Sequence, residues 1–282
     1  MPLTEASRAD FPANSIEKPG YTLEFSDEFD GSELDTGKWL PYYLPQWSSR
    51  ALAAANYTFA NGHLVLQVTE DQQPWCPEYD GDNRASVLQT GVFAGPVGSH
   101  IGQSRFREDL AVREAQDNVQ QYTPQFGYFE ARVKGLTASA SHVSLWMIGY
   151  EEVPEHCGEI CLFELLGSEA GAEESVVRYG VHTWTDPALR EEFFIERFPL
   201  DSTCFHIYAV EWTPAQIDFY IDNVKIRTIE QSPHYPMQFM LGMFERRTQD
   251  AWTGPYNPTD PYPKTFTVDY VRGYQPVVPY PR

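Results

Sequence analysis

Short runs of residues in which apolar and polar side chains alternate constrain this chain more than any other feature. The clearest are residues 64–68, 128–133 and 217–221, which are rich in β-branched and aromatic residues. A period of two is typical of antiparallel strands that bury one face. Asp222 and Asn223 follow the third run, where a tight hairpin needs residues that tolerate a positive φ. The sequence therefore predicts an all-β fold of two stacked antiparallel sheets.

Length and charge narrow the class of protein further. At 282 residues the chain is long enough for one large all-β domain, and its length does not require a second. Forty acidic and twenty basic residues give a net charge of −20, without the Lys/Arg cluster that nucleic-acid binding requires. The sequence has no run of about 18 apolar residues, which a transmembrane helix would need. We therefore expect a monomer with neither a nucleic-acid nor a membrane partner.

Two acidic residues lie five positions apart on an otherwise apolar run, EICLFE at residues 159–164. In a straight strand Glu159 and Cys161 would share one face and Glu164 would point away. A β-bulge with one extra residue between Cys161 and Glu164 would place all three on one face. Retaining glycosidases need two carboxyl groups together in this way, whereas an acidic pair on an edge strand would only be solvated.

The spacing of these acids resembles the E-x-D-x-x-E motif of glycoside hydrolase family 16, the laminarinase and agarase relatives. Other blocks resemble the family in the same order: residues 23–39, NGHLVLQV, FGYFEARVKG, SLWMIG, residues 205–229 and residues 266–275. The resemblance implies a jelly-roll sandwich with a concave glycan-binding cleft, in residues 21–275. Residues 1–20 are then an extended lead-in and residues 276–282 a tail. Glu159 would be the nucleophile and Glu164 the acid/base.

Cys161 departs from the motif because it stands where the family has Asp. A thiol is a weak hydrogen-bond donor with an ordinary pKa of about 8.5, so the site loses a carboxyl group. Cys161 either fills an apolar gap or weakens hydrolysis, and both readings stay open. The other cysteines, Cys76, Cys157 and Cys204, form no zinc pattern. If Cys161 faces the cleft, a disulfide between two of these three would leave the third cysteine unpaired. We therefore expect all four cysteines to be free thiols.

Aromatic and polar side chains are the groups with which a sugar cleft holds its substrate. By resemblance to the family, Trp146 and Trp252 match cleft tryptophans, and His182 lies on the strand beside the site. Trp47 and Arg50 fall in the family's early cleft region. Core packing is the alternative for the tryptophans and for His182.

The family also implies a structural Ca²⁺, although no cofactor is expected for catalysis. The matching ligands are the backbone carbonyls of Glu28 and Gly62 and the side chain of Asp269, since oxygen ligands suit this cation. Asp269 capping a turn is the alternative.

Residues 97–125 form a longer connection than the family usually has at this place. The spacing of Phe106, Leu110 and Val112 is only partly helical, which predicts a long loop with one short helical piece. Long loops in compact domains are often functional, so we interpret this loop as a cleft wall, with a surface insertion as the alternative.

The leading hypothesis is a retaining endo-β-glycanase that cleaves a polysaccharide, β-1,3-glucan first, by double displacement. The five-residue spacing favours β-1,3-glucan or β-galactan over mixed-linkage glucan, and the negative charge favours a neutral polysaccharide. A β-galactan-specific hydrolase and a carbohydrate-binding pseudoenzyme that lost turnover at Cys161 are the alternatives. Family members are mostly secreted, so the resemblance implies an extracellular protein. The first twenty residues do not read as a signal peptide, and a cytoplasmic location stays open.

Overall fold

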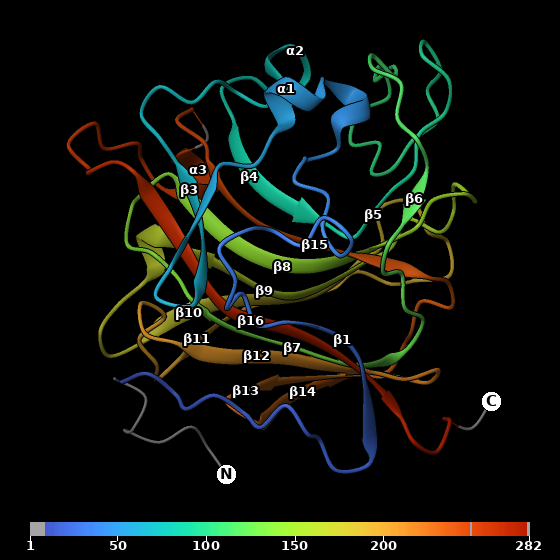
Figure 1. Ribbon diagram of the computed structural model, residues 1–282, viewed down its shortest axis with the longest axis vertical. Coiled ribbons are helices and arrows are strands. Elements are labelled where there is room, and N and C mark those ends of the chain that lie inside the picture. Colours follow the sequence, from blue (N-terminus) through green and yellow to red (C-terminus); the bar gives the residue numbers. More distant parts are fainter. Residues whose placement is uncertain (1–8, 249, 281–282) are drawn as a thin grey trace.

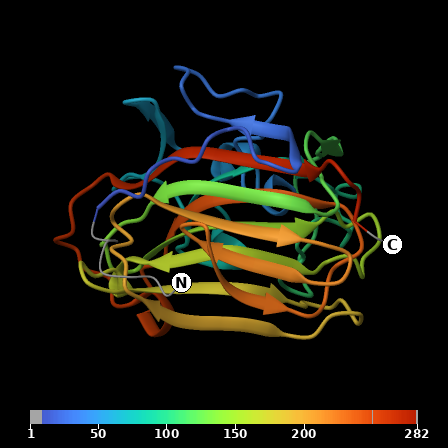
Figure 2. The same ribbon diagram turned by 90° about the horizontal axis from the view of Figure 1, so that it is seen from below.

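The computed structural model describes residues 9–248 and 250–280 (Figure 1). Within these residues two antiparallel sheets, one of eight strands and one of six, form the body of the molecule. Figure 2 shows β7, β12 and β16 of the larger sheet lying side by side across the molecule. The predicted all-β jelly-roll sandwich is confirmed.

The larger sheet has the strand order β14-β13-β12-β7-β16-β3-β2, with β1 paired to β16. Its strands are β1 (Tyr21–Asp27), β2 (Tyr57–Ala60), β3 (His63–Val68), β7 (Gly127–Lys134), β12 (His206–Trp212), β13 (Ile217–Ile221), β14 (Val224–Ile229) and β16 (Lys264–Pro276). The three runs singled out in the sequence are β3, β7 and β13. Asp222 and Asn223 join β13 to β14 with φ values of 49° and 64°, which confirms the predicted hairpin.

The smaller sheet has the order β11-β10-β9-β8-β15-β4. Its strands are β4 (Arg84–Gln89), β8 (Ser141–Gly149), β9 (Glu159–Leu166), β10 (Ser175–His182), β11 (Glu192–Phe198) and β15 (Met237–Glu245). The remaining elements are short: β5 (Gly91–Val92), β6 (Val119–Gln120), α1 (Arg50–Ala53), α2 (Pro77–Asp80), α3 (Asp250–Thr253), η1 (Pro45–Trp47) and η2 (Gly167–Glu169). In Figure 1 the strands of this sheet curve, with their concave side toward the loops at the top.

A main core fills the space between the sheets, and a second core lies on the other face of the smaller sheet. Val87 and Met240 contribute to this second core from β4 and β15, while Leu88 and Leu241, the next residue on each strand, face the main core. Loops supply the rest of it: Leu44, Trp47, Ala53, Trp75, Cys76, Leu110 and Val112 are all buried there. Packed loops therefore cover one side of the concave face.

Residues 97–125 are a long loop, as predicted, but the helical piece is wrong because the loop, described throughout, contains no helix. Leu110 and Val112 are 0% and 2% exposed because they enter the second core. Val119–Gln120 pairs with Gly91–Val92 as a small ladder. The buried side chains of Leu110 and Val112 and this ladder hold the loop in place without helical hydrogen bonds.

Residues 9–20 lie along the outer face of the larger sheet. The Asn14 amide donates to the Glu130 carboxylate at 2.9 Å, and Arg272 donates to the Asn14 carbonyl at 3.0 Å. The Lys18 ammonium lies 3.5 Å from the centre of the Tyr128 ring. The predicted division at residues 20 and 275 stays a prediction, although the lead-in is held on the sheet by these contacts.

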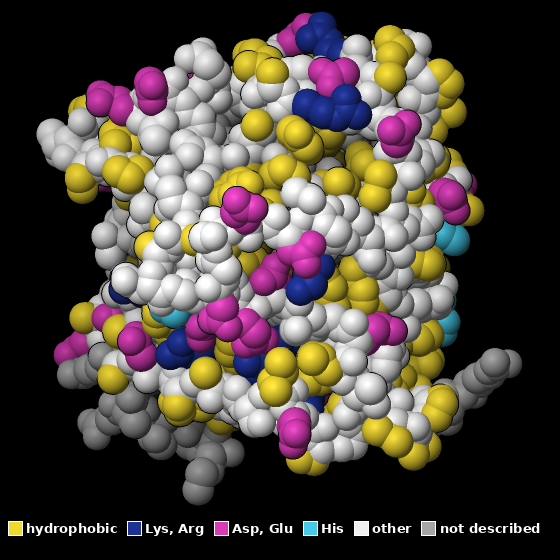
Figure 3. Space-filling view, in the orientation of Figure 1, with side chains coloured by type: hydrophobic (Ala, Val, Ile, Leu, Met, Phe, Trp, Pro, Cys, Tyr) yellow, Lys and Arg dark blue, Asp and Glu magenta, His cyan; other side chains and the backbone are white. Residues whose placement is uncertain are grey.

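Charged side chains of both signs are interspersed over the face drawn in Figure 3, with apolar side chains between them. Among the described residues, no helix is long and apolar enough to cross a membrane. No disulfide joins the four cysteines of the described chain, in agreement with the expected thiols.

Candidate active site

Strand β9 carries a β-bulge at Leu162. On one side of the strand, Trp146 pairs with Cys161 and Leu145 with Phe163, which leaves Leu162 as the extra residue. The ladder to β10 shifts at the same place. As a result Ile160, Leu162, Phe163 and Leu165 all lie in the main core, and the residues between them point to the other face. The bulge predicted from the spacing of the acids is therefore confirmed.

Glu159, Cys161 and Glu164 line one pocket of about 250 Å³ on the concave face. Trp146, His182 and Trp252 line it as well, so six of the predicted residues meet here. Its other lining residues are Tyr43, Trp75, Asp80, Ser104, Phe106, His142, Ser144, Trp184, Phe244 and Arg246. We call this the catalytic pocket.

Glu159 is held by Trp184, whose Nε1 donates to its Oε2 at 3.0 Å. Burial raises the pKa of this carboxyl, while His182 and the Trp184 hydrogen bond act in the opposite direction. His182 is itself positioned by two contacts: its ring stacks on Phe193 at 4.1 Å, and its Nδ1 lies 2.5 Å from Glu191 Oε1. The pKa of Glu159 is therefore raised on balance, and the Trp184 hydrogen bond and the His182 imidazole reduce this rise by stabilising the ionised form.

Glu164 lies in a different environment. Burial raises its pKa to about 7, and the charge of Glu159 acts in the same direction. The Arg178 guanidinium, 3.5 Å away, and a hydrogen bond with Trp252 partly oppose this rise. A carboxyl with a pKa near 7 holds its proton through much of the neutral range and can release it there, as a general acid must.

Cys161 lies between these two carboxyl groups and is 2% exposed. Burial raises the pKa of its thiol well above the usual value, and the charges of Glu159 and Glu164 raise it further. The residue is therefore a neutral thiol at neutral pH. It contributes no charge to the site and is unsuited to act as a thiolate nucleophile.

The wall opposite β10 includes residues that the sequence did not single out. Arg246 pairs with Asp80 at 3.3 Å, and Trp75 Nε1 donates to the same carboxylate at 2.7 Å. No motif marks Asp80 or Arg246, because the end of α2 and the loop after β15, which carry them, meet only in the fold. Trp184 was also missed, although it stands two residues after His182, where the period of a strand would place it on the same face.

Trp47 and Arg50 are not among the residues that line the catalytic pocket; the prediction of Trp47 as a sugar-binding residue is wrong because its ring is buried, and that of Arg50 stays a prediction. Trp47 is 0% exposed, and its Nε1 donates to the Gln103 carbonyl at 2.8 Å. Trp47 is buried because its ring packs into the second core, beneath the loops. Arg50 pairs with Glu114 at 3.1 Å and ties its helix to residues 97–125.

The residues proposed to bind Ca²⁺ are arranged around nitrogen groups. The two oxygens of Asp269 lie 2.6 Å from Arg132 Nη1 and 3.2 Å from His63 Nδ1. Arg272 pairs with the Glu28 side chain at 2.7 Å. The described residues contain no group of three or more His, Cys, Asp and Glu that could hold a metal ion. The Asp269 carboxylate, the one side-chain ligand predicted, is therefore paired with nitrogen groups, whereas a hard cation needs free oxygen ligands; the calcium site, whose other ligands are the carbonyls of Glu28 and Gly62, stays a prediction.

Two carboxyl groups in one pocket on the concave face of a jelly-roll sandwich are typical of the glycoside hydrolases that have this fold. The sequence itself agrees with this class, since residues 113–272 match the model of glycosyl hydrolases family 16. The chain belongs to that family.

Two similar proteins have names that refer to β-galactosides. The solved structure of the GlcNAcα1-4Gal releasing endo-β-galactosidase from Clostridium perfringens superposes with a TM-score of 0.84 at 37% identity, over 96% of this chain and 66% of that chain. A keratan-sulfate endo-1,4-β-galactosidase of Sphingobacterium multivorum is 24% identical over 97% of this chain and 61% of its own length. This chain thus spans less than two thirds of either protein.

A laminarinase from Flavobacterium sp. UMI-01 is similar in fold, with a TM-score of 0.63 at 22% identity, over 90% of this chain and 100% of that chain. This similarity supports the architecture alone.

Proposed function

We propose that this protein is a retaining endo-β-glycanase that cleaves β-galactosidic linkages within a glycan. The observation that carries the proposal is the placement of Glu159 and Glu164 in one pocket with different surroundings. Retaining glycosidases need two carboxyl groups about 5 to 5.5 Å apart, one to attack and one to move the proton. The β-galactosidic linkage is supported by the similarity to the Clostridium enzyme over 96% of this chain.

In the first step the Glu159 carboxylate attacks the anomeric carbon of the bound sugar. The glycosidic C–O bond breaks, and the leaving oxygen takes the proton of Glu164. Glu164, now a carboxylate, then removes a proton from a water molecule, whose oxygen attacks the same carbon and releases Glu159. Two inversions give a product of retained configuration.

β-1,3-Glucan is the second candidate substrate. The five-residue spacing of Glu159 and Glu164, with its bulge at Leu162, is the feature from which β-1,3-glucan was predicted. The same spacing fits a β-galactan equally well. The sequence-based preference for β-1,3-glucan therefore stays a prediction. A carbohydrate-binding protein without turnover, with its neutral thiol at Cys161, is the alternative outside the enzymes. The extracellular location and the monomeric state also remain predictions.

A glycan panel tests the proposal. Purified protein is incubated with keratan-type galactan, agar-type galactan, laminarin and mixed-linkage glucan, and new reducing ends and product sizes are measured. We expect oligosaccharides from a galactan, with the β-anomer seen first by NMR. Glycan binding without new reducing ends would overturn the enzyme assignment. Cleavage of laminarin alone would replace the proposed linkage by β-1,3-glucan.

A further inference from the structure

His142 lines the catalytic pocket, and no step of the proposed mechanism uses it. It lies on β8, where Ser144 follows at the strand period of two and lines the same pocket. In the ladder between β8 and β9, Ser144 is opposite Glu164, so His142 lies two residues beyond the acid. The His142 ring is therefore at the end of the pocket that holds the proton donor.

Two aromatic rings hold the His142 side chain in place. The imidazole is stacked on Phe244, with the ring centres 4.7 Å apart and the planes at 14°, and the centre of the Trp252 ring is 4.8 Å away. Trp252 also makes a hydrogen bond with Glu164. The orientation of the imidazole is thus fixed by rings that themselves line the pocket.

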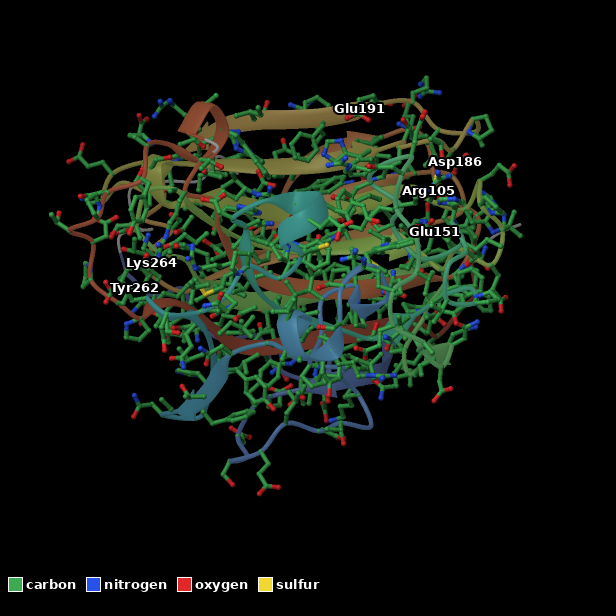
Figure 4. The ribbon with its side chains drawn as sticks, turned by 90° about the horizontal axis from the view of Figure 1, so that it is seen from above. Arg105, Glu151, Asp186, Glu191, Tyr262 and Lys264 are labelled. Carbon is green, nitrogen blue, oxygen red and sulfur yellow. The ribbon has the colours of Figure 1, made fainter. Side chains whose placement is uncertain are left out.

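The strand end that carries Phe244 is anchored by a buried ion pair. Glu245, the next residue on β15, is 0% exposed, and its carboxylate lies 2.8 Å from Lys264 Nζ and accepts a hydrogen bond from Tyr262 at 2.5 Å. Figure 4 shows Tyr262 and Lys264 close together at one end of the molecule. Because these contacts hold Glu245, Phe244 has little freedom to move, and the His142 ring that it supports is preorganised for a ligand.

The surroundings of His142 decide which of its nitrogens carries the proton. The residue is 3% exposed, and burial, together with the Arg246 and Arg178 cations, holds the pKa of its imidazole well below the usual value. The ring is therefore neutral at neutral pH and carries a single N–H. Nδ1 is buried and has no hydrogen-bond partner among the residues that the structure describes. A buried N–H without an acceptor loses the hydrogen bond that it makes in water, so the proton belongs on Nε2, the nitrogen that remains for the pocket.

A neutral N–H donor suits a hydroxyl group of a sugar. Other donors near the glutamates are engaged by them: Trp184 Nε1 donates to Glu159, and the Arg178 guanidinium pairs with Glu164. Ser144, which is 4% exposed, adds a hydroxyl that can donate or accept. The pocket thus offers a small polar patch beside the proton donor, between aromatic rings that suit the C–H face of a sugar.

We propose that His142 binds a hydroxyl group of the sugar that lies against Glu164, by donating a hydrogen bond from Nε2. His142 then holds the glycan for the proton transfer without taking part in it. This inference rests on the proposed function, because it needs a glycan in the catalytic pocket. The long loop of residues 97–125 lines the same pocket through Ser104 and Phe106, so the loop is a cleft wall in this structure.

A stability measurement separates this role from packing. His142→Phe keeps an aromatic ring against Phe244 and removes the buried unpaired nitrogen, so we expect a Tm equal to or above that of the unchanged protein. His156→Phe is the matched control, because the His156 ring stacks on Tyr235 at 4.5 Å and 13° but is not among the residues that line the catalytic pocket. A lower Tm for His142→Phe with unchanged glycan binding would assign the residue to packing and overturn the proposal.

Side-chain ¹⁵N NMR identifies the protonated nitrogen directly. We expect a neutral His142 ring with its proton on Nε2 at neutral pH, and a shift of the Nε2 resonance when an oligosaccharide is bound. The resonance is assigned by its absence from His142→Phe. A proton on Nδ1, or an Nε2 resonance that does not respond to a bound oligosaccharide, would overturn the proposal.

A binding test separates this inference from the proposed activity. Tetrasaccharides of agar-type galactan, keratan-type galactan and laminarin are titrated calorimetrically into the Glu159→Gln variant, which cannot form the covalent intermediate. Adding His142→Phe should weaken the binding of the tightest ligand about threefold to tenfold, the range for one hydrogen bond. His142→Gln, whose amide can also donate, should restore part of the affinity, and His156→Phe should leave it unchanged.

Equal affinities with and without His142→Phe would overturn the inference even if the unchanged protein cleaves a galactan. The same holds if none of the three tetrasaccharides binds. Weaker binding in the His142→Phe variant of a protein that cleaves none of the glycans would uphold the inference while the proposed activity fails.

Discussion

The two glutamates of the catalytic pocket lie on one strand, yet their surroundings differ. Glu159 accepts a hydrogen bond from Trp184 and lies near His182, both of which favour its ionised form. Glu164 has Arg178 beside it, but burial and the charge of Glu159 still raise its pKa to about 7. Burial raises the pKa of both side chains, but their charged neighbours differ, and the assignment of Glu159 as nucleophile and Glu164 as acid is a prediction that these neighbours allow to be tested.

Replacing the nucleophile should have the largest effect. Glu159→Gln keeps the shape of the side chain and an oxygen for Trp184 but cannot form the covalent intermediate. We expect hydrolysis of every substrate, aryl glycosides included, to fall on the order of 10⁴-fold or more, as when a nucleophile is removed from a covalent mechanism. Initial rates measure this loss. Glu155→Gln, an exposed change four residues earlier, is the control and should retain full activity. An active Glu159→Gln variant with an unchanged Tm would contradict the assignment.

Replacing the acid should be less severe and should depend on the leaving group. Glu164→Gln removes the proton donor, so we expect a loss of about 10² to 10⁴-fold on the natural glycan. An activated aryl glycoside leaves without a proton, and on it the first step should stay within about tenfold of the unchanged protein. The rate of that step is measured from the burst of nitrophenol that a nitrophenyl glycoside releases in the first turnover. Equal losses for the Glu159 and Glu164 variants in this assay would remove the distinction between them.

Cys161→Asp restores the carboxyl that the family places between the two glutamates, and we expect a several-fold rise in kcat/KM on the preferred glycan. Because the position is 2% exposed, the new carboxyl should be largely protonated and should donate a hydrogen bond to a neighbouring glutamate. Cys161→Ser, which adds a small donor without a carboxyl, is the matched control. A lower rate in the Asp variant, measured across pH, would show that the site is adapted to the thiol.

Much of this comparison could be predicted from the sequence. Glu159, Cys161 and Glu164 are contiguous in one strand, so their spacing and a bulge were enough to place them on one face, and the bulge occurs at Leu162. The strands and the hairpin at Asp222 and Asn223 depend on local patterns and were predicted for the same reason.

The surroundings of the glutamates could not be predicted in the same way. Asp80 and Arg246 meet across 166 residues of sequence, and no local pattern carries such a contact. Trp47 is buried because loops distant from it in the chain complete a second core. Packing between loops, which decides exposure, is set by the whole fold.

Arg178→Gln should move the basic limb of the pH–rate profile. The Arg178 cation lowers the pKa of Glu164, so its removal raises that pKa further. The acid then keeps its proton to higher pH, and we expect the basic limb of kcat/KM on the natural glycan to shift upward by roughly one pH unit. Arg178→Lys retains the charge and is the control, which should shift less. A basic limb that stays in place would show that Glu164 is not the group that sets it.

Trp184→Phe should have the smallest effect, and on the opposite limb. The change keeps the aromatic ring but removes the Nε1 hydrogen bond that lowers the pKa of Glu159. Glu159 must be ionised to attack, so a higher pKa moves the acidic limb toward higher pH and narrows the active range. Because Trp184 is 57% exposed, water shares the role of its hydrogen bond, and we expect a shift of less than about one pH unit. Profiles of kcat/KM for this variant and Arg178→Gln, recorded on one substrate, should therefore differ in which limb moves. If Trp184→Phe moves the basic limb instead, the two glutamates have exchanged roles and the comparison between them is reversed.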